Sequence, residues 1–121
     1  MPSLPAELAR ERMLELTTTG RKSGQPRKTK IWFVAQGDRV FVQAGPKGLK
    51  GWYANLKATP TVSLSIRGRE FAGLARPLTE TRDAEHVLAL VRQKYWLARV
   101  AGWLGAKIGH GKPVEIRLTD D

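Results

Sequence analysis

The fold is decided by one stretch near the start of the chain, Leu16-Thr-Thr-Thr-Gly-Arg-Lys-Ser-Gly-Gln-Pro-Arg27, which is soon followed by Lys30-Ile-Trp-Phe-Val34. It places glycines, hydroxyls and cations in a tight turn between two apolar segments. Such a turn offers free backbone N–H groups, hydroxyl donors and guanidinium groups at one place, and these groups bind phosphate or carboxylate. The stretch therefore predicts an anion-binding turn at the edge of a coenzyme site.

Working outward from this turn, alternating apolar and polar residues predict short strands. The segment Leu16–Thr19 is β-prone, and the five other expected strands are Lys30–Gln36, Val40–Ala44, Val62–Ile66, Glu70–Pro77 and Pro113–Thr119. Six short and mostly antiparallel strands leave exposed edges unless the sheet closes on itself. We therefore expect a mainly β fold, a small barrel with helices.

Three helices are expected beside the strands. A short one spans Pro5 to Leu14, and another spans Trp52 to Lys57. A long helix from about Arg82 to Leu104, capped by Thr81, has apolar residues at 3.6-residue spacing and precedes the last strand. We expect it to cover an opening of the barrel. The absence of βαβ alternation argues against a Rossmann domain.

Length and composition set the broad class. The 121 residues predict a single domain, residues 1–121. No cysteine is present, so the fold uses no disulfide and the site no thiolate. The first sixteen residues lack the apolar centre of a secretion signal, and no apolar run reaches membrane-spanning length. We expect a cytoplasmic protein without a membrane span.

The net charge of +10 is concentrated near the anion-binding turn. Between Gly20 and Pro60, nine Lys and Arg residues face one acid, Asp38. This segregation indicates an anionic partner. A basic face that merely aids solubility is the simpler alternative, but we favour a functional anion site because the cations coincide with glycine turns. Nucleic acid is an alternative partner.

The usual catalytic groups are missing. The histidines His86 and His110 show no metal-ligand spacing, the carboxylates are scattered, and Ser23 has no nearby base. We therefore predict no metal site and identify no catalytic residue. If the protein is an enzyme, a bound cofactor performs the difficult step.

A second feature, Gly51-Trp-Tyr-Ala-Asn-Leu56, follows a basic, glycine-rich loop. We expect Leu56 to pack on the barrel and Asn55 to cap local backbone. Trp52 either covers a flat ligand or packs in the core. Trp96 and Trp103, seven residues apart, line a dimer interface or a pocket wall, or pack in the core.

These motifs resemble the deazaflavin-dependent nitroreductase family. The resemblance rests on the turn motif, on Gly51–Leu56 and on Asn55-Leu-Lys-Ala-Thr-Pro60, and it extends from about Leu16 to Leu118. It implies a split β-barrel oxidoreductase that binds the deazaflavin coenzyme F420. Some related proteins bind FMN or haem instead.

The resemblance also implies a set of coenzyme contacts. Arg21, Lys22, Ser23, Gln25 and Arg27 would hold the phosphate and the acidic glutamyl tail, and the backbone of Lys28, Thr29, Lys30 and Ile31 would follow the polar edge of the ring. Ala44, Gly45, either Lys47 or Lys50, and Trp52 would complete the site.

The leading hypothesis is a reductase that uses F420 to reduce a flat, electron-poor molecule such as a quinone, an enone or a nitroaromatic. An FMN-binding oxidoreductase is the first alternative. A nucleic-acid-binding barrel, with Trp32, Phe33, Trp52 and Tyr53 as stacking platforms, is the less favoured second one. We lean to a homodimer, because related split barrels often pair.

Overall fold

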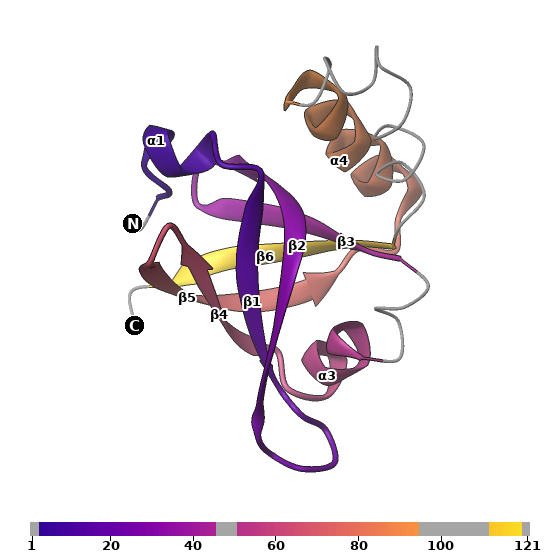
Figure 1. The fold of residues 1–121 in the computed structure, drawn as a ribbon. Coiled ribbons are helices and arrows are strands. Elements are labelled where there is room, and N and C mark those ends of the chain that lie inside the picture. The colour runs from indigo at the N-terminus through magenta and orange to yellow at the C-terminus, as the bar shows by residue number, and fades with distance from the viewer. Residues whose placement is uncertain (1–2, 46–50, 95–111, 120–121) are drawn as a thin grey trace.

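A computed structural model describes residues 3–45, 51–94 and 112–119, and it shows a closed β-barrel (Figure 1). Its elements are, in chain order, α1 (Ala6–Ala9), β1 (Met13–Thr19), β2 (Pro26–Gln36), β3 (Arg39–Ala44), α3 (Trp52–Ala58), β4 (Thr61–Ile66), β5 (Arg69–Pro77), α4 (Thr81–Lys94) and β6 (Lys112–Thr119). The strands are antiparallel neighbours in the order β1-β2-β3-β6-β5-β4. The predicted mainly β class is confirmed.

The barrel core follows from period-two alternation along the strands. The inward-facing residues of β4 are Val62, Leu64 and Ile66, and those of β6 are Val114, Ile116 and Leu118; all are buried. The short helices add to the same core: Leu8 comes from α1 and Leu56 from α3. In Figure 1 these two helices lie on different sides of the strands.

The N-terminal helix is much shorter than predicted. It covers only Ala6–Ala9, and residues 13 and 14, which were expected to be at or near its end, already belong to β1. The reason is that Leu14, Leu16 and Thr18 are spaced by two and are all buried, so extended backbone buries more of this segment than a helix would. The prediction of a helix from Pro5 to Leu14 was wrong in its extent.

Strand β2 begins at Pro26, earlier than the predicted Lys30. Its first residues carry no apolar alternation, yet they pair with β1 in register, with Thr19 opposite Pro26 and Thr17 opposite Lys28. Cross-strand pairing here extends a strand that its own side chains do not reveal. The turn therefore closes a long hairpin that projects below the barrel in Figure 1.

Helix α4 precedes the last strand, as predicted, and packs on the outer face of β2 and β3. Its Val87 and Val91 form a small cluster with Val34, Phe41 and Leu78, separate from the barrel core. The helix thus covers a face of the barrel and not an opening. Its continuation to Leu104 lies outside the described residues, as do Trp96, Trp103 and His110.

The start of α4 also differs from the prediction. Thr81 is its first helical residue, and the carbonyl of Glu80 accepts the first helical bond, from the N–H of Ala84 at 3.1 Å. Glu80 therefore occupies the N-cap position that was expected for Thr81.

Candidate coenzyme site

The site begins where β2 and β3 part. Strand β2 pairs with β1 over residues 26–32, but it pairs with β3 only over residues 33–36. Beyond that point β3 continues beside β6, where Gln43 and Ala44 pair with Pro113 and Lys112. Within the described part of the chain, the first half of β2 therefore has a strand neighbour on one side only.

The phase of the β1–β2 hydrogen bonds decides which backbone groups face this open edge. The N–H of Phe33 donates to the carbonyl of Arg12 at 3.3 Å, and the N–H of Gly20 donates to the carbonyl of Gln25 at 2.8 Å. Because such pairs alternate in an antiparallel ladder, the backbone groups of Thr29 and Ile31 point toward β1. Those of Lys28 and Lys30 point toward the open edge, where a ligand can meet them.

A cavity of about 440 Å³ lies beside this edge. It is enclosed by the β1–β2 turn, the start of β2 and the first turn of α3. Its lining residues are Gly20, Arg21, Lys22, Ser23, Arg27, Lys28, Thr29, Gly51, Trp52 and Asn55. The fold thus brings together two motifs, the turn and the tryptophan segment, that lie about thirty residues apart in the sequence.

Seven of the predicted coenzyme residues line this cavity: Arg21, Lys22, Ser23, Arg27, Lys28, Thr29 and Trp52. The others are placed elsewhere. Gln25 lies in the turn, where its N–H donates to Ser23 Oγ at 3.1 Å. The Ala44 side chain is buried in the barrel core, and Gly45 is exposed beyond the end of β3. Lys47 and Lys50 lie outside the described residues.

A smaller cavity, of about 180 Å³, lies farther along β2, between the parting strands and α4. Two further predicted coenzyme residues, Lys30 and Ile31, line this smaller cavity. Its other lining residues are Met13, Trp32, Phe33, Phe41, Val42, Gln43 and Val91. Most of these are apolar. The two cavities therefore follow one strand, the first cationic and the second mainly apolar.

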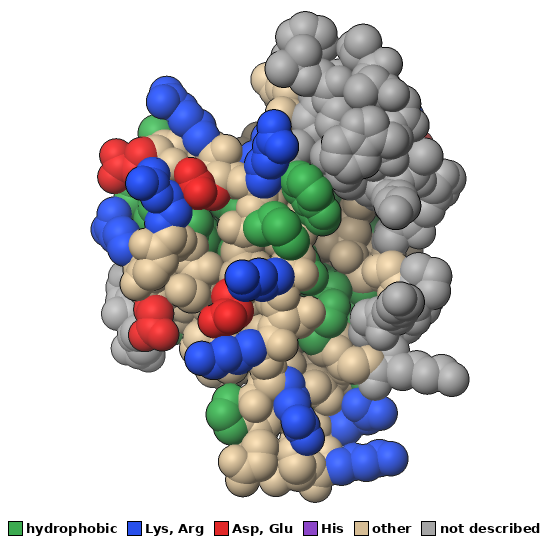
Figure 2. All heavy atoms as spheres, in the orientation of Figure 1, with side chains coloured by type: hydrophobic (Ala, Val, Ile, Leu, Met, Phe, Trp, Pro, Cys, Tyr) green, Lys and Arg blue, Asp and Glu red, His purple; other side chains and the backbone are tan. Residues whose placement is uncertain are grey.

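The larger cavity is strongly cationic. Of the lining residues that the structure describes, four carry positive charge, Arg21, Lys22, Arg27 and Lys28, and none is a carboxylate. Lys28 has a carboxylate near it, Glu15 at 3.9 Å, but the Lys28 side chain is 66% exposed, so the pair holds it weakly. Figure 2 shows Lys and Arg side chains following one another over β1 and β2 toward the turn.

Asn55 is the residue of this cavity whose role the sequence did not reveal. Its Oδ1 accepts from the Arg21 backbone N–H and from Arg21 Nη1, both at 3.2 Å, and its Nδ2 donates to Thr18 Oγ1 at 3.3 Å. The prediction that it caps local backbone was wrong. Its partners are 34 and 37 residues away, so no local pattern could have identified them.

The aromatic residues do not form an exposed row. Phe33 is 2% exposed and Trp52 is 9% exposed, both within the barrel core. Trp52 combines the two roles that the sequence left open, because it packs in the core and also lines the cavity. A stacking platform for single-stranded nucleic acid needs accessible rings, and of the four residues named for it Phe33 and Trp52 are buried whereas Trp32 and Tyr53 are partly exposed.

Among the residues that the structure describes, neither a histidine nor a carboxylate lines either cavity. Among the described residues, no three His, Cys, Asp or Glu side chains gather where they could hold a metal ion. The described helices include none that is long and apolar enough to cross a membrane. What this site can do is bind an anion and a flat group side by side.

A closed antiparallel barrel, with two strands that part beside a cationic cavity, defines the split-barrel class of protein. Sequence comparison agrees, because the model of the F420H(2)-dependent quinone reductase family matches residues 4–103. The chain belongs to this family.

Individual relatives agree with this assignment. An F420H(2)-dependent quinone reductase of Mycobacterium tuberculosis is 38% identical over 68 residues, which are 54% of this chain and 46% of the relative. The chain thus matches about half the length of this curated relative.

Two solved structures resemble the fold. An F420-H2 dependent reductase, FDR-A, has a TM-score of 0.64 and 27% identity, with 90% of this chain and 95% of that chain covered. A structure described as a domain-swapped dimer has a TM-score of 0.65 and 28% identity, with 90% of this chain and 81% of that chain covered.

Proposed function

We propose that this protein binds coenzyme F420 and uses its reduced form to reduce quinones or similar flat, electron-poor molecules. One observation carries the proposal: a single cavity unites the anion-binding turn, the open edge of β2 and Trp52. Membership of the quinone reductase family supports the choice of coenzyme and of substrate class.

The residues present fit such a coenzyme. The turn supplies the cations Arg21 and Lys22, which suit a phosphate and further carboxylates. Gly20 allows the turn to close, because a Cβ there would lie 2.6 Å from Ser23 Oγ and 3.2 Å from the Gln25 carbonyl. The open edge offers alternating donors and acceptors to a flat heterocycle.

When bound, reduced F420 supplies a hydride. The chain itself binds, orients and shields, which suits a reaction that depends on proximity and alignment. The smaller apolar cavity has room for a flat substrate ring next to the open edge, and Lys30 there can stabilise negative charge on a quinone oxygen. Since no acid is among the described lining residues of either cavity, we expect the proton to come from solvent.

The direct test mixes purified protein, reduced F420 and a soluble quinone, and follows the return of deazaflavin absorbance. Thermal shifts with F420, FMN and haem identify the coenzyme, because a ligand that binds only the folded state raises its melting temperature. We expect a shift with F420. A shift with FMN alone would identify FMN and not F420 as the coenzyme. No shift with any of the three would reject the coenzyme site.

Charge reversal tests the turn itself. Arg21→Glu together with Lys22→Glu should weaken F420 binding about 100-fold or more, because two charge-assisted contacts become repulsions. A matched control reverses two exposed cations of α4, Arg82→Glu with Arg92→Glu, and so changes the net charge equally. Equal F420 affinity in the turn variant and the wild type would show that the turn does not contact the coenzyme.

We also propose a homodimer, with the domain-swapped relative as support. Within the described residues the exposed large hydrophobic side chains are Met13 and Leu74, 41% and 40% exposed, and pairing would cover such side chains. Light scattering after size-exclusion chromatography tests this, and a monomer at micromolar concentration would refute it. A cytoplasmic location stays a prediction.

A further inference from the structure

Asn55 connects three elements at one point. It lies in the first turn of α3, it accepts two bonds from Arg21 in the β1–β2 turn, and it donates one bond to Thr18 on β1. Asn55 is only 5% exposed and Thr18 only 1%, so the bond between them is buried, whereas Arg21 is exposed and lines the cationic cavity.

The orientation of the Asn55 amide is fixed by its partners. The backbone N–H and the guanidinium of Arg21 can only donate, so they require the carbonyl oxygen of Asn55. The amide nitrogen then faces the Thr18 hydroxyl, which can accept. Every polar atom of the side chain is therefore used, and the cluster has one self-consistent arrangement.

This arrangement holds Arg21 twice, by its main chain and by its side chain. A guanidinium has five N–H donors, and Asn55 occupies a donor of Nη1, which leaves the others for an anion. Trp52 lies three residues before Asn55 on the same helix, and both residues line the cavity. By bonding Arg21, the Asn55 side chain therefore links the helix that carries Trp52 to the turn that carries the cation.

We propose that Asn55 is the positioning residue of the anion site. It holds Arg21 in the geometry that binds the coenzyme phosphate, and it acts on binding through Arg21. The inference rests on the proposed function for its ligand, but the link between Asn55 and Arg21 is a property of the protein alone. Preorganisation of this kind raises affinity because the ordering cost is met before the ligand arrives.

The first test needs no coenzyme. In the wild type, the Arg21 amide should exchange with deuterium much more slowly than the neighbouring Lys22 amide, as measured by NMR. Asn55→Ala should abolish this difference, whereas Asn55→Asp should preserve it, because a carboxylate oxygen still accepts both Arg21 bonds. Unchanged Arg21 exchange in the Asn55→Ala variant would overturn the proposal.

The second test measures F420 affinity in a double-mutant cycle. Asn55→Ala should weaken binding about tenfold, the equivalent of one lost contact. Added to Arg21→Gln, it should weaken binding no further, since Asn55 acts through Arg21. Additive losses in the double variant would show that Asn55 acts independently and would overturn the proposal.

The variant Asn55→Asp distinguishes an effect on coenzyme binding from a loss of folding. Its carboxylate would hold Arg21 in place but would also neutralise it and repel a phosphate, so affinity should fall at least tenfold while the melting temperature is kept. Full affinity in this variant would contradict the proposal, and it remains informative if the alanine variant does not fold.

The matched control is Lys57→Ala on the same helix. Lys57 is exposed, lies outside the cavity lining and should leave affinity unchanged. A wild type that does not bind F420 would reject the proposed function, whereas the exchange measurements would still decide the role of Asn55.

Discussion

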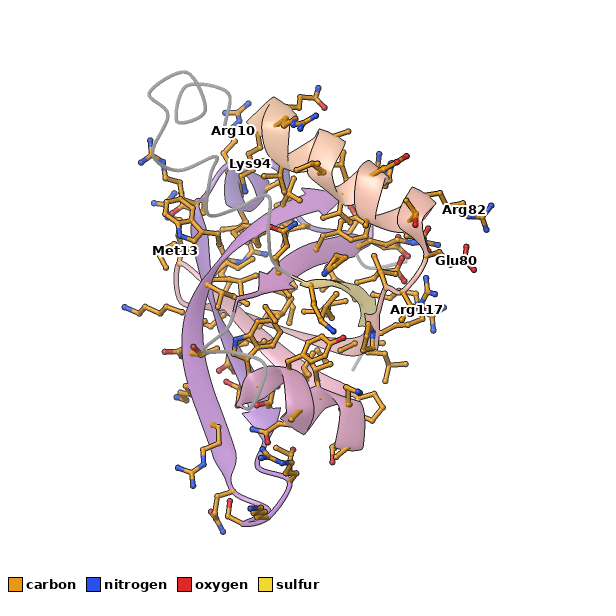
Figure 3. All side chains as sticks on the ribbon, turned by 90° about the vertical axis from the view of Figure 1, so that its right-hand side faces the viewer. Arg10, Met13, Glu80, Arg82, Lys94 and Arg117 are labelled. Carbon is orange, nitrogen blue, oxygen red and sulfur yellow. The ribbon has the colours of Figure 1, made fainter. Side chains whose placement is uncertain are left out.

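Lys94, the last described residue of α4, joins this helix to the barrel. Its ammonium donates to the carbonyls of Glu11 at 2.6 Å and Phe33 at 2.9 Å, and it lies 3.8 Å from the centre of the Phe33 ring. In Figure 3 it lies near Arg10, far from Arg82 at the other end of the helix. Burial lowers the pKa of Lys94 to about 8, against the attraction of Glu11, which raises it.

This pKa predicts a pH dependence of stability with a definite sign. In the unfolded chain Lys94 has its ordinary pKa of 10.5, so between about pH 8 and 10.5 the unfolded state binds more protons than the folded state. The free energy of unfolding should therefore rise with pH across this window, relative to the Lys94→Met variant, which does not titrate there.

Denaturant unfolding of both proteins at several pH values measures this difference. Well below pH 8 the difference between them should be constant, since Lys94 is then protonated in both states. A difference that falls between pH 8 and 10.5 would mean that the buried contacts favour the charged ammonium more than burial opposes it.

At the scale of elements, the close approach of β5 and β6 depends on Gly73. A Cβ at this position would lie 2.6 Å from Ile116 Cγ2 and 3.2 Å from the Arg117 carbonyl oxygen. Ile116 is fully buried, so it has little room to move. Gly73→Ala should therefore destabilise the protein by about 1–3 kcal/mol through overpacking.

Thermal or denaturant unfolding checks this prediction, with Gly45→Ala as the control. A Cβ on Gly45 would meet no described residue within 4 Å, and its φ is not in the left-handed region. Equal stability of the two variants would show that the strands can separate without cost.

The elements also show what sequence patterning can and cannot predict. Strand β4 has strict alternation, and its prediction was right within one residue. The first residues of β2 became a strand only because β1 lies beside them, which is a tertiary effect on a polar segment. The short α1 has the same cause, since Leu14 is recruited into β1 by the barrel core.

The features of the site also differ in how far the sequence alone predicts them. The composition of the turn from Gly20 to Pro26 predicts anion binding by itself, because its donors are local. The role of Asn55 depends on Thr18 and Arg21, which belong to the β1–β2 hairpin and which the fold places beside α3. The smaller cavity depends on where β2 and β3 part, and that point follows from barrel closure and not from any motif.

For the molecule as a whole, charge is distributed unevenly around a closed barrel. The chain carries 21 Lys and Arg against 11 Asp and Glu. The carboxylates of Glu7, Glu11 and Glu115 each lie near arginines away from the turn, whereas the charged residues in the described part of the cavity lining are all cations. The field of the protein should therefore guide an anion toward the cavity.

Steering of this kind predicts a salt-dependent association rate for F420, measured by stopped-flow fluorescence. The Debye length falls from about 30 Å at 0.01 M salt to about 10 Å at 0.1 M, so the association rate should fall several-fold while the dissociation rate changes less. The turn variant Arg21→Glu with Lys22→Glu and the α4 variant Arg82→Glu with Arg92→Glu have the same net charge. If the local field guides the coenzyme, the turn variant loses most of the salt dependence and the α4 variant keeps it. If the association rates of the two variants depend equally on salt concentration, net charge alone attracts the coenzyme. The cations at the turn would then contribute to affinity but not to the association rate.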